Sequence, residues 1–269
     1  MIEKILFPVD FSPACLAMVP YVRRAADLFA SQVTLVHIVD LASHNGFELY
    51  VRSRQEIADE HQSIAESKLK SFLESEFPQA ISRRILSAGE PASQIAAIAR
   101  TGGFDLIVMP THASRFRRML LGSTTAKVLN DSVCPVLTTE HAMTEVPRSL
   151  EHRVWACAIG LSRDSERVLH LAGRAAAAAG AKLCLIHVTH NGAEIGARQH
   201  LDELQKAAGS AAAVHMATGP VKERLLDEAR RAEADALIIG RNPGAGAVGR
   251  IRDLVYSLVR DSPFPVLSV

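Results

Sequence analysis

The chain has 269 residues, 48% of them hydrophobic and 22% charged, and a formal net charge of +1. This length suits one large domain or two of ordinary size, with enough apolar residues for a core. The balance of 30 basic against 29 acidic residues argues against nucleic acid as a partner. No segment reaches the roughly 18 apolar residues of a membrane span. The N-terminal stretch MIEKILFPVDFSP lacks the pattern of a signal peptide. We therefore expect a cytoplasmic protein with no membrane partner.

The first half of the chain predicts alternating strands and helices. The apolar run KILFPV is typical of a buried parallel strand, and Ser12 followed by Pro13 marks the start of a helix that continues to Phe29. Periodicity then predicts a strand at VTLVHIV, a helix over 52–77, a strand at ISRRILSAG, a helix over 91–101, a strand at FDLIVMP, a helix over 123–131 and a strand at CPVLTT. This alternation predicts an α/β fold with parallel sheets and right-handed crossovers.

The second half of the chain repeats the first. Residues 11–40 align without a gap over residues 161–190, and residues 89–110 align over 219–240. The ends match as well, with DSVCPVLTT over DSPFPVLSV. The second copy lacks about 20 residues between its second strand and its Gly219 turn. We predict two domains, 1–143 and 150–269, which are joined by a hinge near 144–152.

A ligand site is expected where the strand order of each sheet reverses. If each copy has the order 3-2-1-4-5, the reversal lies between its first and fourth strands, and ligands bind beyond their carboxyl ends. In the first copy Asp10 follows strand one, and the stretch THASRFRRMLLGSTT follows strand four. A carboxylate there can hold a ribose hydroxyl. The helix that begins at Gly122, Ser123 and Thr124 offers free N–H groups that suit phosphate.

These features together resemble the universal stress protein (UspA) family. The resemblance rests on ILFPVDFS, VTLVHIVD, GEPASQIAAIA, FDLIVMPTHA, LLGSTTAKVL and CPVL, in this order and over nearly all of the chain. It implies two tandem Rossmann-like domains of the adenine nucleotide alpha hydrolase-like type, each with a five-stranded parallel sheet of order 3-2-1-4-5 flanked by helices. It also implies ATP binding in some members and none in others, and domain pairing through the last strand.

The resemblance also implies a set of site residues in the first domain. Nucleotide-binding members share a Gly-two-Gly-nine-Gly-Ser/Thr pattern after strand four, whose first two glycines fall here on Pro110 and Ala113. Pro110 has no N–H to donate, and the Cβ of Ala113 lies where a phosphate should come close. Eight residues, rather than the nine of the pattern, separate Ala113 from Gly122. The residues expected to hold ATP or AMP, with Mg²⁺ accompanying ATP, are Val9, Asp10, Val39 at the adenine edge, Pro110, His112, Ala113, Gly122, Ser123 and Thr124. The other interpretation is that these residues are signatures of the fold alone.

The second domain departs further from the pattern. Gly160 stands where the first copy has Asp10, and Arg252 and Asp253 stand where it has Gly122 and Ser123. The sequence Gly244-x-Gly246-x-x-Gly249 matches a dinucleotide fingerprint, but it follows a fourth strand rather than a first. We therefore favour a flexible loop there. Arg250 and Arg252 could still attract an anion.

Other candidate residues have a structural explanation beside the functional one. His37 and His187 occupy equivalent strand positions; paired metal ligands are one interpretation, and contacts at the polar ends of the sheets are the favoured one. Arg115, Arg117 and Arg118 either reach phosphate or form a solvated face. The four cysteines show no CxxC spacing and are expected to be buried thiols. The sequence leaves three functions open: a stress-response module that binds nucleotide, a ligand-free interaction protein with unnamed protein partners, and a slow ATPase.

The last strands of the two copies predict how the copies meet. Residues 136–139 and 266–269 are short apolar strands at the edges of their sheets, and an exposed apolar edge favours aggregation unless it is paired. A symmetric antiparallel pair satisfies both edges at once. We therefore predict an intramolecular pseudo-dimer, in which the first domain's partner is the chain's own second domain.

Overall fold

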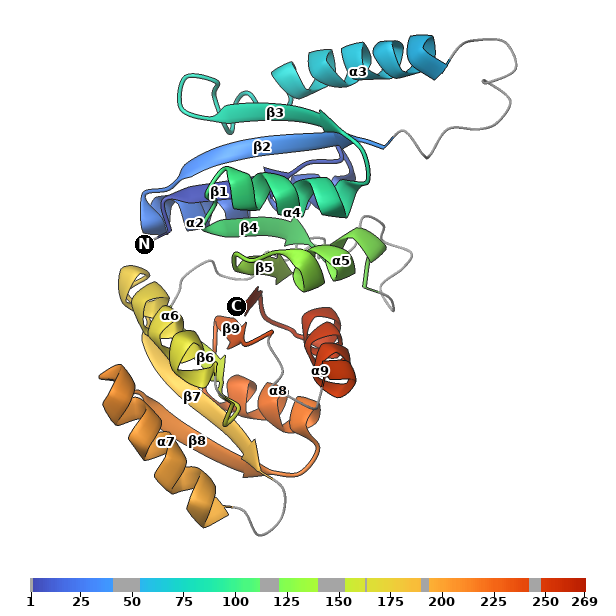
Figure 1. Cartoon of the computed structure of the whole chain (residues 1–269). Helices are drawn as coiled ribbons and strands as arrows, with labels where there is room; N and C mark the ends of the chain where they lie inside the picture. Colours follow the sequence, from blue (N-terminus) through green and yellow to red (C-terminus); the bar gives the residue numbers. More distant parts are fainter. Residues whose placement is uncertain are drawn as a thin grey trace. The chain divides into compact units, whose positions relative to one another are not determined.

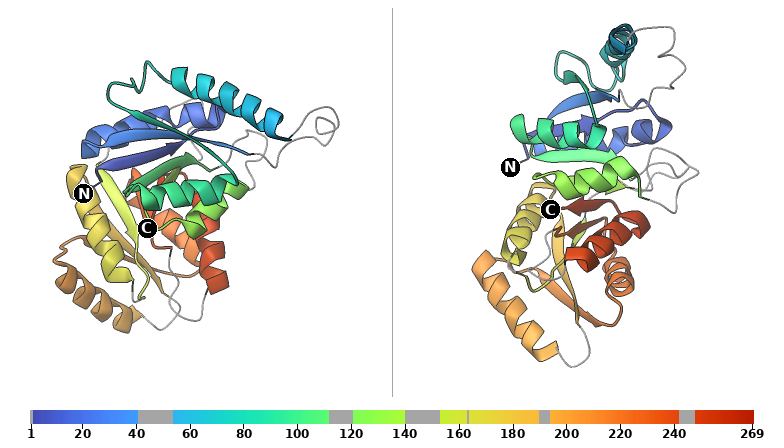
Figure 2. Two further views of the ribbon diagram at one scale, coloured as in Figure 1. Left: turned by 45° about the horizontal axis from the view of Figure 1, so that its top comes forward. Right: turned by 45° about the vertical axis from the view of Figure 1, so that its right-hand side comes forward.

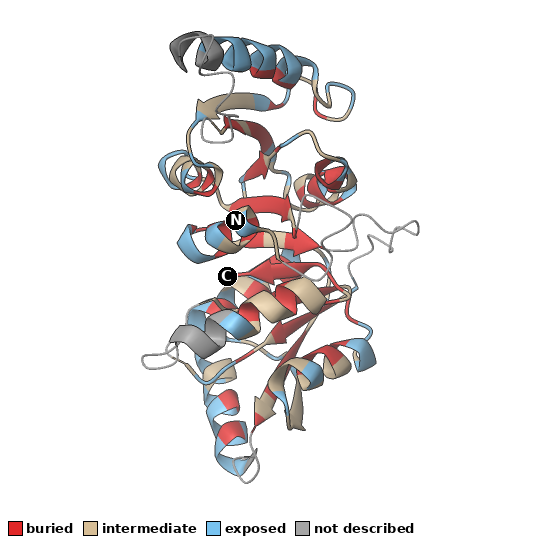
Figure 3. Ribbon diagram, turned by 90° about the vertical axis from the view of Figure 1, so that its right-hand side faces the viewer, coloured by how far each residue is buried: buried red, intermediate tan, exposed pale blue. Residues whose placement is uncertain are grey.

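A computed structural model describes residues 2–40, 54–111, 121–139, 153–162, 164–189, 194–241 and 248–269 (Figure 1). Their contacts divide the chain into two compact units, an N-terminal and a C-terminal unit. Each unit contains strands that are buried in the middle of a sheet and helices that flank both of its faces (Figure 3).

The N-terminal unit contains four parallel strands in the order β3-β2-β1-β4. The strands are β1 (Lys4–Pro8), β2 (Gln32–Val39), β3 (Arg83–Ala88) and β4 (Leu106–Pro110). The helices are α1 (Pro13–Ala17), α2 (Val19–Phe29), α3 (Arg54–Ser71), α4 (Pro91–Thr101) and α5 (Ser123–Asp131). Helix α3 packs along β2 and β3, at the edge of this sheet (Figure 2).

The C-terminal unit contains the second repeat. Its strands are β6 (Val154–Ala158), β7 (Lys182–Thr189), β8 (Ala213–Thr218), β9 (Ala236–Ile239) and β10 (Val266–Ser268). Its helices are α6 (Ser165–Ala178), α7 (Glu194–Ala208), α8 (Val221–Arg231) and α9 (Val248–Asp261). The strands are parallel in the order β8-β7-β6-β9-β10, which confirms the predicted order 3-2-1-4-5 for this repeat.

Strand β5 (Val136–Thr139) closes the first repeat in sequence, yet its contacts place it in the C-terminal unit. It pairs antiparallel with β10, and Leu137 lies opposite Leu267. The Thr138 hydroxyl also donates to the Val266 carbonyl at 3.4 Å. Strand β10 is thus paired on both sides, with β9 on one side and β5 on the other.

The apolar runs of the sequence lie in the middle of the sheets. Ile5, Leu6 and Phe7 of β1 are fully buried, as are Ile107 and Val108 of β4. A strand with helices on both faces has no polar side, which explains why these runs are continuous rather than alternating. The four cysteines are free and buried, as predicted.

Two predicted helices differ from the observed ones. The first is interrupted at Met18, because Pro20 has no N–H to donate and can only begin a new helix, α2. The predicted helix 52–77 ends at Ser71, and Leu73 has a positive φ of 54° that a helix cannot contain. Helices α3 and α7 are similar in length, with 18 and 15 residues. Most of the residues that the second repeat lacks therefore belong to the connections before and after this helix.

Arg84 on β3 anchors the turn that follows α3. Its guanidinium side chain is only 9% exposed. The guanidinium donates to the carbonyls of Leu69 at 3.0 Å, Phe72 at 3.2 Å and Phe77 at 2.9 Å, to the Ser82 hydroxyl at 3.1 Å and to the Glu74 carboxylate at 2.9 Å. One side chain therefore satisfies three carbonyls, one in the last turn of α3 and two in the turn that follows it.

We expect Arg84→Ala to lower the free energy of unfolding by about 2–4 kcal/mol, because several buried acceptors lose their donor at once. Urea unfolding followed by circular dichroism measures this loss. Arg83→Ala is the matched control, since Arg83 is exposed on the same strand and should change stability little. Equal effects of the two substitutions would contradict the anchoring role.

Candidate functional site

Strands β1 and β4 bring the predicted site residues to one edge of the N-terminal sheet. The two strands are parallel neighbours, with Ile5 opposite Leu106, so Val9 and Pro110 lie at the same carboxyl edge. Two hydrogen bonds then fix the start of α5 against the end of β4. The Gly122 N–H donates to the Thr111 carbonyl at 2.9 Å, and the Thr125 hydroxyl donates to the Pro110 carbonyl at 3.0 Å.

The first turn of α5 has unsatisfied backbone donors. No side chain caps the helix at Gly122, and within the described residues the N–H groups of Ser123 and Thr124 have no acceptor. These donors and the positive end of the helix dipole suit an anion. The Gly122 N–H is not available to a ligand, because it is already bonded to Thr111.

Asp10 lies beyond the end of β1 and is exposed. One of its carboxylate oxygens accepts the Ser12 N–H at 2.9 Å, which fixes the carboxylate relative to the backbone. Phe11 between them has a φ of 61°, an uncommon backbone conformation for a bulky residue. Its ring packs 4.4 Å from the His37 ring and 4.9 Å from the Phe72 ring, and the Lys68 ammonium lies 4.4 Å from its centre. This packing holds the strained turn that carries Asp10.

The thiol beside this carboxylate is not activated. Burial first, and then the negative charge of Asp10, raise the pKa of Cys15 to about 12. The backbone hydrogen bonds of Asp10 and Phe11 act in the opposite direction but do not offset the burial. Cys15 therefore stays a neutral thiol near pH 7, which makes it a poor nucleophile.

Val39 occupies the carboxyl end of β2. It is buried, and its carbonyl accepts the N–H of Gly89 at 3.0 Å. This bond ties the end of β2 to the turn before α4. The edge predicted for adenine is thus a fixed part of the sheet.

Several predicted residues fall outside the described parts of the chain. They are His112, Ala113, Arg115, Arg117 and Arg118 in the first repeat, and Gly244 and Gly246 in the second. Gly249 lies inside α9, which begins at Val248 and therefore about one turn earlier than α5 does in its repeat. Arg252 and Asp253 are consequently inside a helix, whereas their counterparts Gly122 and Ser123 form a helix start.

His37 and His187 make the same contact in the two repeats. The Nδ1 atom of each lies 2.7 Å from a carbonyl oxygen, that of Val9 or of Ile159. Because a carbonyl can only accept, each Nδ1 carries the hydrogen. Each histidine therefore joins its second strand to the end of the first, as the interpretation of strand-end contacts predicts. No group of three or more possible metal ligands occurs in the described parts of the chain.

A cluster at the start of α4 was not predicted. The Glu90 carboxylate accepts the N–H of Ser93 at 2.8 Å and its hydroxyl at 2.7 Å, and it pairs with Lys127 of α5 at 2.9 Å. Lys127, followed by Ser93, lowers the pKa of Glu90 to about 2. An acidic residue directly before Pro91 is a capping signal that the sequence carries, whereas its partner on α5 is visible only in the fold.

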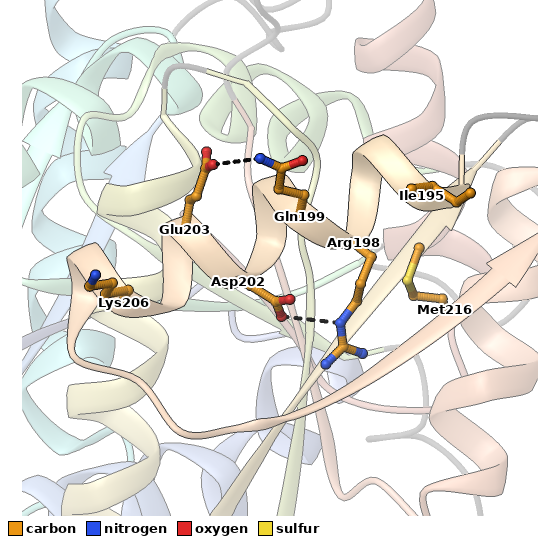
Figure 4. Close-up of a pocket in the computed structure, with 7 residues that line it drawn as sticks. All are labelled: Ile195, Arg198, Gln199, Asp202, Glu203, Lys206 and Met216. Atoms are coloured by element: carbon orange, nitrogen blue, oxygen red, sulfur yellow. Dashed lines mark hydrogen bonds and ion pairs between the residues drawn. The ribbon is translucent and has the colours of Figure 1, made fainter.

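A hollow in the C-terminal unit lies apart from the predicted residues. It has a volume of about 630 Å³ and is lined by Ile195, Arg198, Gln199, Asp202, Glu203 and Lys206 of α7 and Met216 of β8 (Figure 4). Its polar groups pair along the helix: Arg198 forms an ion pair with Asp202 at 3.1 Å, and the Gln199 amide donates to Glu203 at 3.2 Å. Paired side chains of this kind are typical of a solvated helix face rather than of a reactive site.

The doubly wound parallel sheets and the polar groups at the switch point define a Rossmann-like α/β protein. The family model described as Universal stress protein family matches residues 1–139, and the chain belongs to this family. A universal stress protein of Methanocaldococcus jannaschii is 28% identical over 155 residues, which are 52% of this chain and 96% of that protein. The crystal structure of a universal stress protein from Archaeoglobus fulgidus covers all of this chain and 98% of its own, with a TM-score of 0.74 and 24% identity.

A second Archaeoglobus fulgidus structure, a universal stress protein in complex with dAMP, matches 44% of this chain and 98% of its own, with a TM-score of 0.36 and 19% identity. The full-length match in the first structure agrees with a tandem arrangement of two family domains. Within the described residues, no helix is long and apolar enough to cross a membrane.

The pair of Glu90 and Lys127 gives a prediction for stability against pH. A folded-state pKa below the ordinary value of 4.5 stabilises the fold above pH 4.5, and the contribution is lost as pH falls toward 2. We expect Glu90→Gln to lower the urea midpoint slightly at pH 7, and this difference from the unaltered protein to shrink below pH 4.5. The effect is small because the two side chains are 44% and 57% exposed.

The control for this measurement is Glu66→Gln, which removes an exposed carboxylate from α3. Its urea midpoint should follow that of the unaltered protein at every pH. A difference between Glu90→Gln and the unaltered protein that stays constant down to pH 2 would show that the charge of Glu90 contributes nothing.

Proposed function

We propose that this chain is a stress-response binding module that takes one adenine nucleotide, ATP or AMP, at the first repeat. The observation that carries the proposal is the start of α5, whose open N–H groups are fixed at the end of β4, beside the strand that carries Asp10. The second repeat has neither part of this arrangement, since Gly160 replaces the acid and α9 begins earlier.

Each site residue has a proposed role. Asp10 accepts hydrogen bonds from the ribose hydroxyls, and the N–H groups of Ser123 and Thr124 bind phosphate oxygens. Val39 forms the adenine edge. Val9, Pro110, His112, Ala113 and Gly122 complete the pocket, and Mg²⁺ accompanies ATP as the counter-ion of its phosphates. The neutral Cys15 thiol offers no nucleophile beside Asp10, so we propose binding, with weak ATP hydrolysis at most.

We expect Asp10→Ala to weaken binding of ATP or AMP at least tenfold, about 1.4 kcal/mol, because the ribose loses its acceptor. Isothermal titration calorimetry measures the change. Asp27→Ala is the matched control, since it removes one exposed acid from α2 in the same unit and should leave affinity unchanged. An unchanged affinity in Asp10→Ala would contradict the placement of the ribose.

The same titration gives the stoichiometry, for which we expect at most one nucleotide per chain. A value near two would show that the second repeat also binds nucleotide.

Mass spectrometry of the gently denatured protein then separates the proposal from the ligand-free alternative. Two features favour the ligand-free alternative. Pro110 has no N–H for phosphate, and the Gly122 N–H is already bonded to the Thr111 carbonyl. Co-purified adenine nucleotide supports binding.

We further propose that residues 1–143 and 150–269 are two domains that form an internal dimer through their last strands. The antiparallel register of β5 and β10 supports this arrangement, because such a register is symmetric about a twofold axis. A chain that supplies both edges needs no second copy to cover them.

Deletion of residues 265–269 tests this pairing. We expect the shortened protein to aggregate or to dimerise between chains, because the edge of β5 loses its partner. Size-exclusion chromatography with light scattering measures the mass. Ser268→Ala is the control, since it keeps the backbone ladder of β10 and should remain a single species like the unaltered protein. A monomeric deletion variant would contradict the pairing.

A further inference from the structure

The turn that carries Asp10 has a strained backbone that the second repeat does not share. Phe11 has a φ of 61°, in a region that a bulky side chain rarely occupies. Leu161 stands at the equivalent position of the second repeat, after Gly160, and its φ is not positive. The strained residue therefore accompanies the acid, and the fold forms without either. This association points to a role of the strain at the acid.

The strained conformation is supported by contacts from the end of α3. The Phe72 ring, directly after this helix, meets the Phe11 ring edge to face, with the ring centres 4.9 Å apart. The Lys68 ammonium lies 4.4 Å from the centre of the Phe11 ring. A third contact, from His37 at 4.4 Å, comes from β2 and is fixed in the sheet. Aromatic pairs and cation–π contacts are favourable beyond the area they bury, so they offset part of the strain.

Arg84 extends these contacts to β3. Its guanidinium donates to the Phe72 carbonyl at 3.2 Å, and the Phe72 N–H donates to the Lys68 carbonyl at 3.0 Å. The backbone of Phe72 is thus held by β3 and by α3 together. A continuous set of contacts leads from the edge of the sheet through Phe72 and Phe11 to Asp10.

Helix α3 is less firmly held than the sheet on which it packs. Among its described side chains, those of residues 59–71, only Ala65 and Leu69 are buried. An element with few buried apolar side chains opens locally at a lower free energy than the core strands. The end of α3 is therefore the part of this contact path that gives way first.

Movement of α3 away from the sheet changes the turn at Asp10. Phe11 then loses Phe72 and Lys68, and the ordinary negative φ becomes the favoured conformation. The Asp10 carboxylate accepts the Ser12 N–H at 2.9 Å across this same turn. A change at Phe11 breaks that bond and releases the carboxylate from its position.

We infer that α3 controls the nucleotide site by positioning Asp10 through Phe72 and Phe11. This inference rests on the function proposed above, in which Asp10 accepts from the ribose hydroxyls. The packed helix holds the carboxylate in place for the ribose, and displacement of the helix releases it. Because coupling between two sites is reciprocal, a bound nucleotide also stabilises the packing of α3. Phe72 and Phe11 are positioning residues in this account.

Amide hydrogen exchange of the full chain, measured by NMR without nucleotide, tests the positioning by itself. We expect the Ser12 N–H to exchange at least about fivefold faster in Phe72→Ala, because its carboxylate acceptor leaves. Phe104→Ala is the matched control, since it removes another partly buried ring of the same unit, beside Gly102. It should leave the exchange of Ser12 unchanged.

Calorimetric titration with ATP tests the consequence for the site. We expect Phe72→Ala to weaken binding about fivefold and Phe104→Ala to leave it unchanged. In an Asp10→Ala background, Phe72→Ala should have no further effect, because it acts through that carboxylate. In a Phe11→Asn background it should also have none, since asparagine adopts a positive φ without support from a ring.

Unchanged exchange of Ser12 in Phe72→Ala, or equal acceleration in Phe104→Ala, would overturn the inference. Further loss of ATP affinity on adding Phe72→Ala to Asp10→Ala would overturn it as well, because Phe72 would then act by another route. Faster exchange of Ser12 in a protein that binds no ATP would support the control of Asp10 by α3 and contradict the proposed function. The two failures are thus distinguishable.

Discussion

The burial of the first strand of each repeat is the constraint on which the rest of the structure depends. Strand β1 lies between β2 and β4, and β6 lies between β7 and β9, so neither has a face or an edge in solvent. Their polar residues are therefore confined to the strand ends. In both repeats a histidine ring closes the carboxyl end by donating to its carbonyl, His37 to Val9 and His187 to Ile159. The residues that follow, Asp10 and Gly160, are exposed beyond the buried strand.

In each repeat an ion pair joins two neighbouring helices, α4 and α5 in the first and α8 and α9 in the second. In the first repeat an acid at the start of α4 pairs with Lys127 of α5. In the second repeat Lys222 in the first turn of α8 pairs with Asp261 at the end of α9, whose pKa is lowered to about 2 by Arg260 first and then by Lys222. An ion pair between the two helices is present in both repeats, with its charges reversed and at positions that are not equivalent. The packing of the two helices is thus what the fold requires, and the choice of ions is not.

The sequence predicts the fold well where local signals agree with the buried pattern. Helices α4 and α5 begin and end at the predicted residues, because Pro91 and the Gly122–Ser123 pair are strong start signals. The break at Met18 was missed because apolar spacing continues through it, although Pro20 carried the information. The site is less predictable. The contacts of Phe11 and Lys127 are made between segments far apart in the chain, and periodicity cannot reveal them.

The difference between Asp10 and Gly160 has a physical explanation in the independence of the strand ends from the buried sheet. A substitution beyond the last buried residue does not disturb the sheet, so Gly160 replaces Asp10 with no change in the register of β6 against β7. The buried strands thus fix the register of each repeat, whereas the residues beyond their carboxyl ends can differ between the repeats without disturbing it.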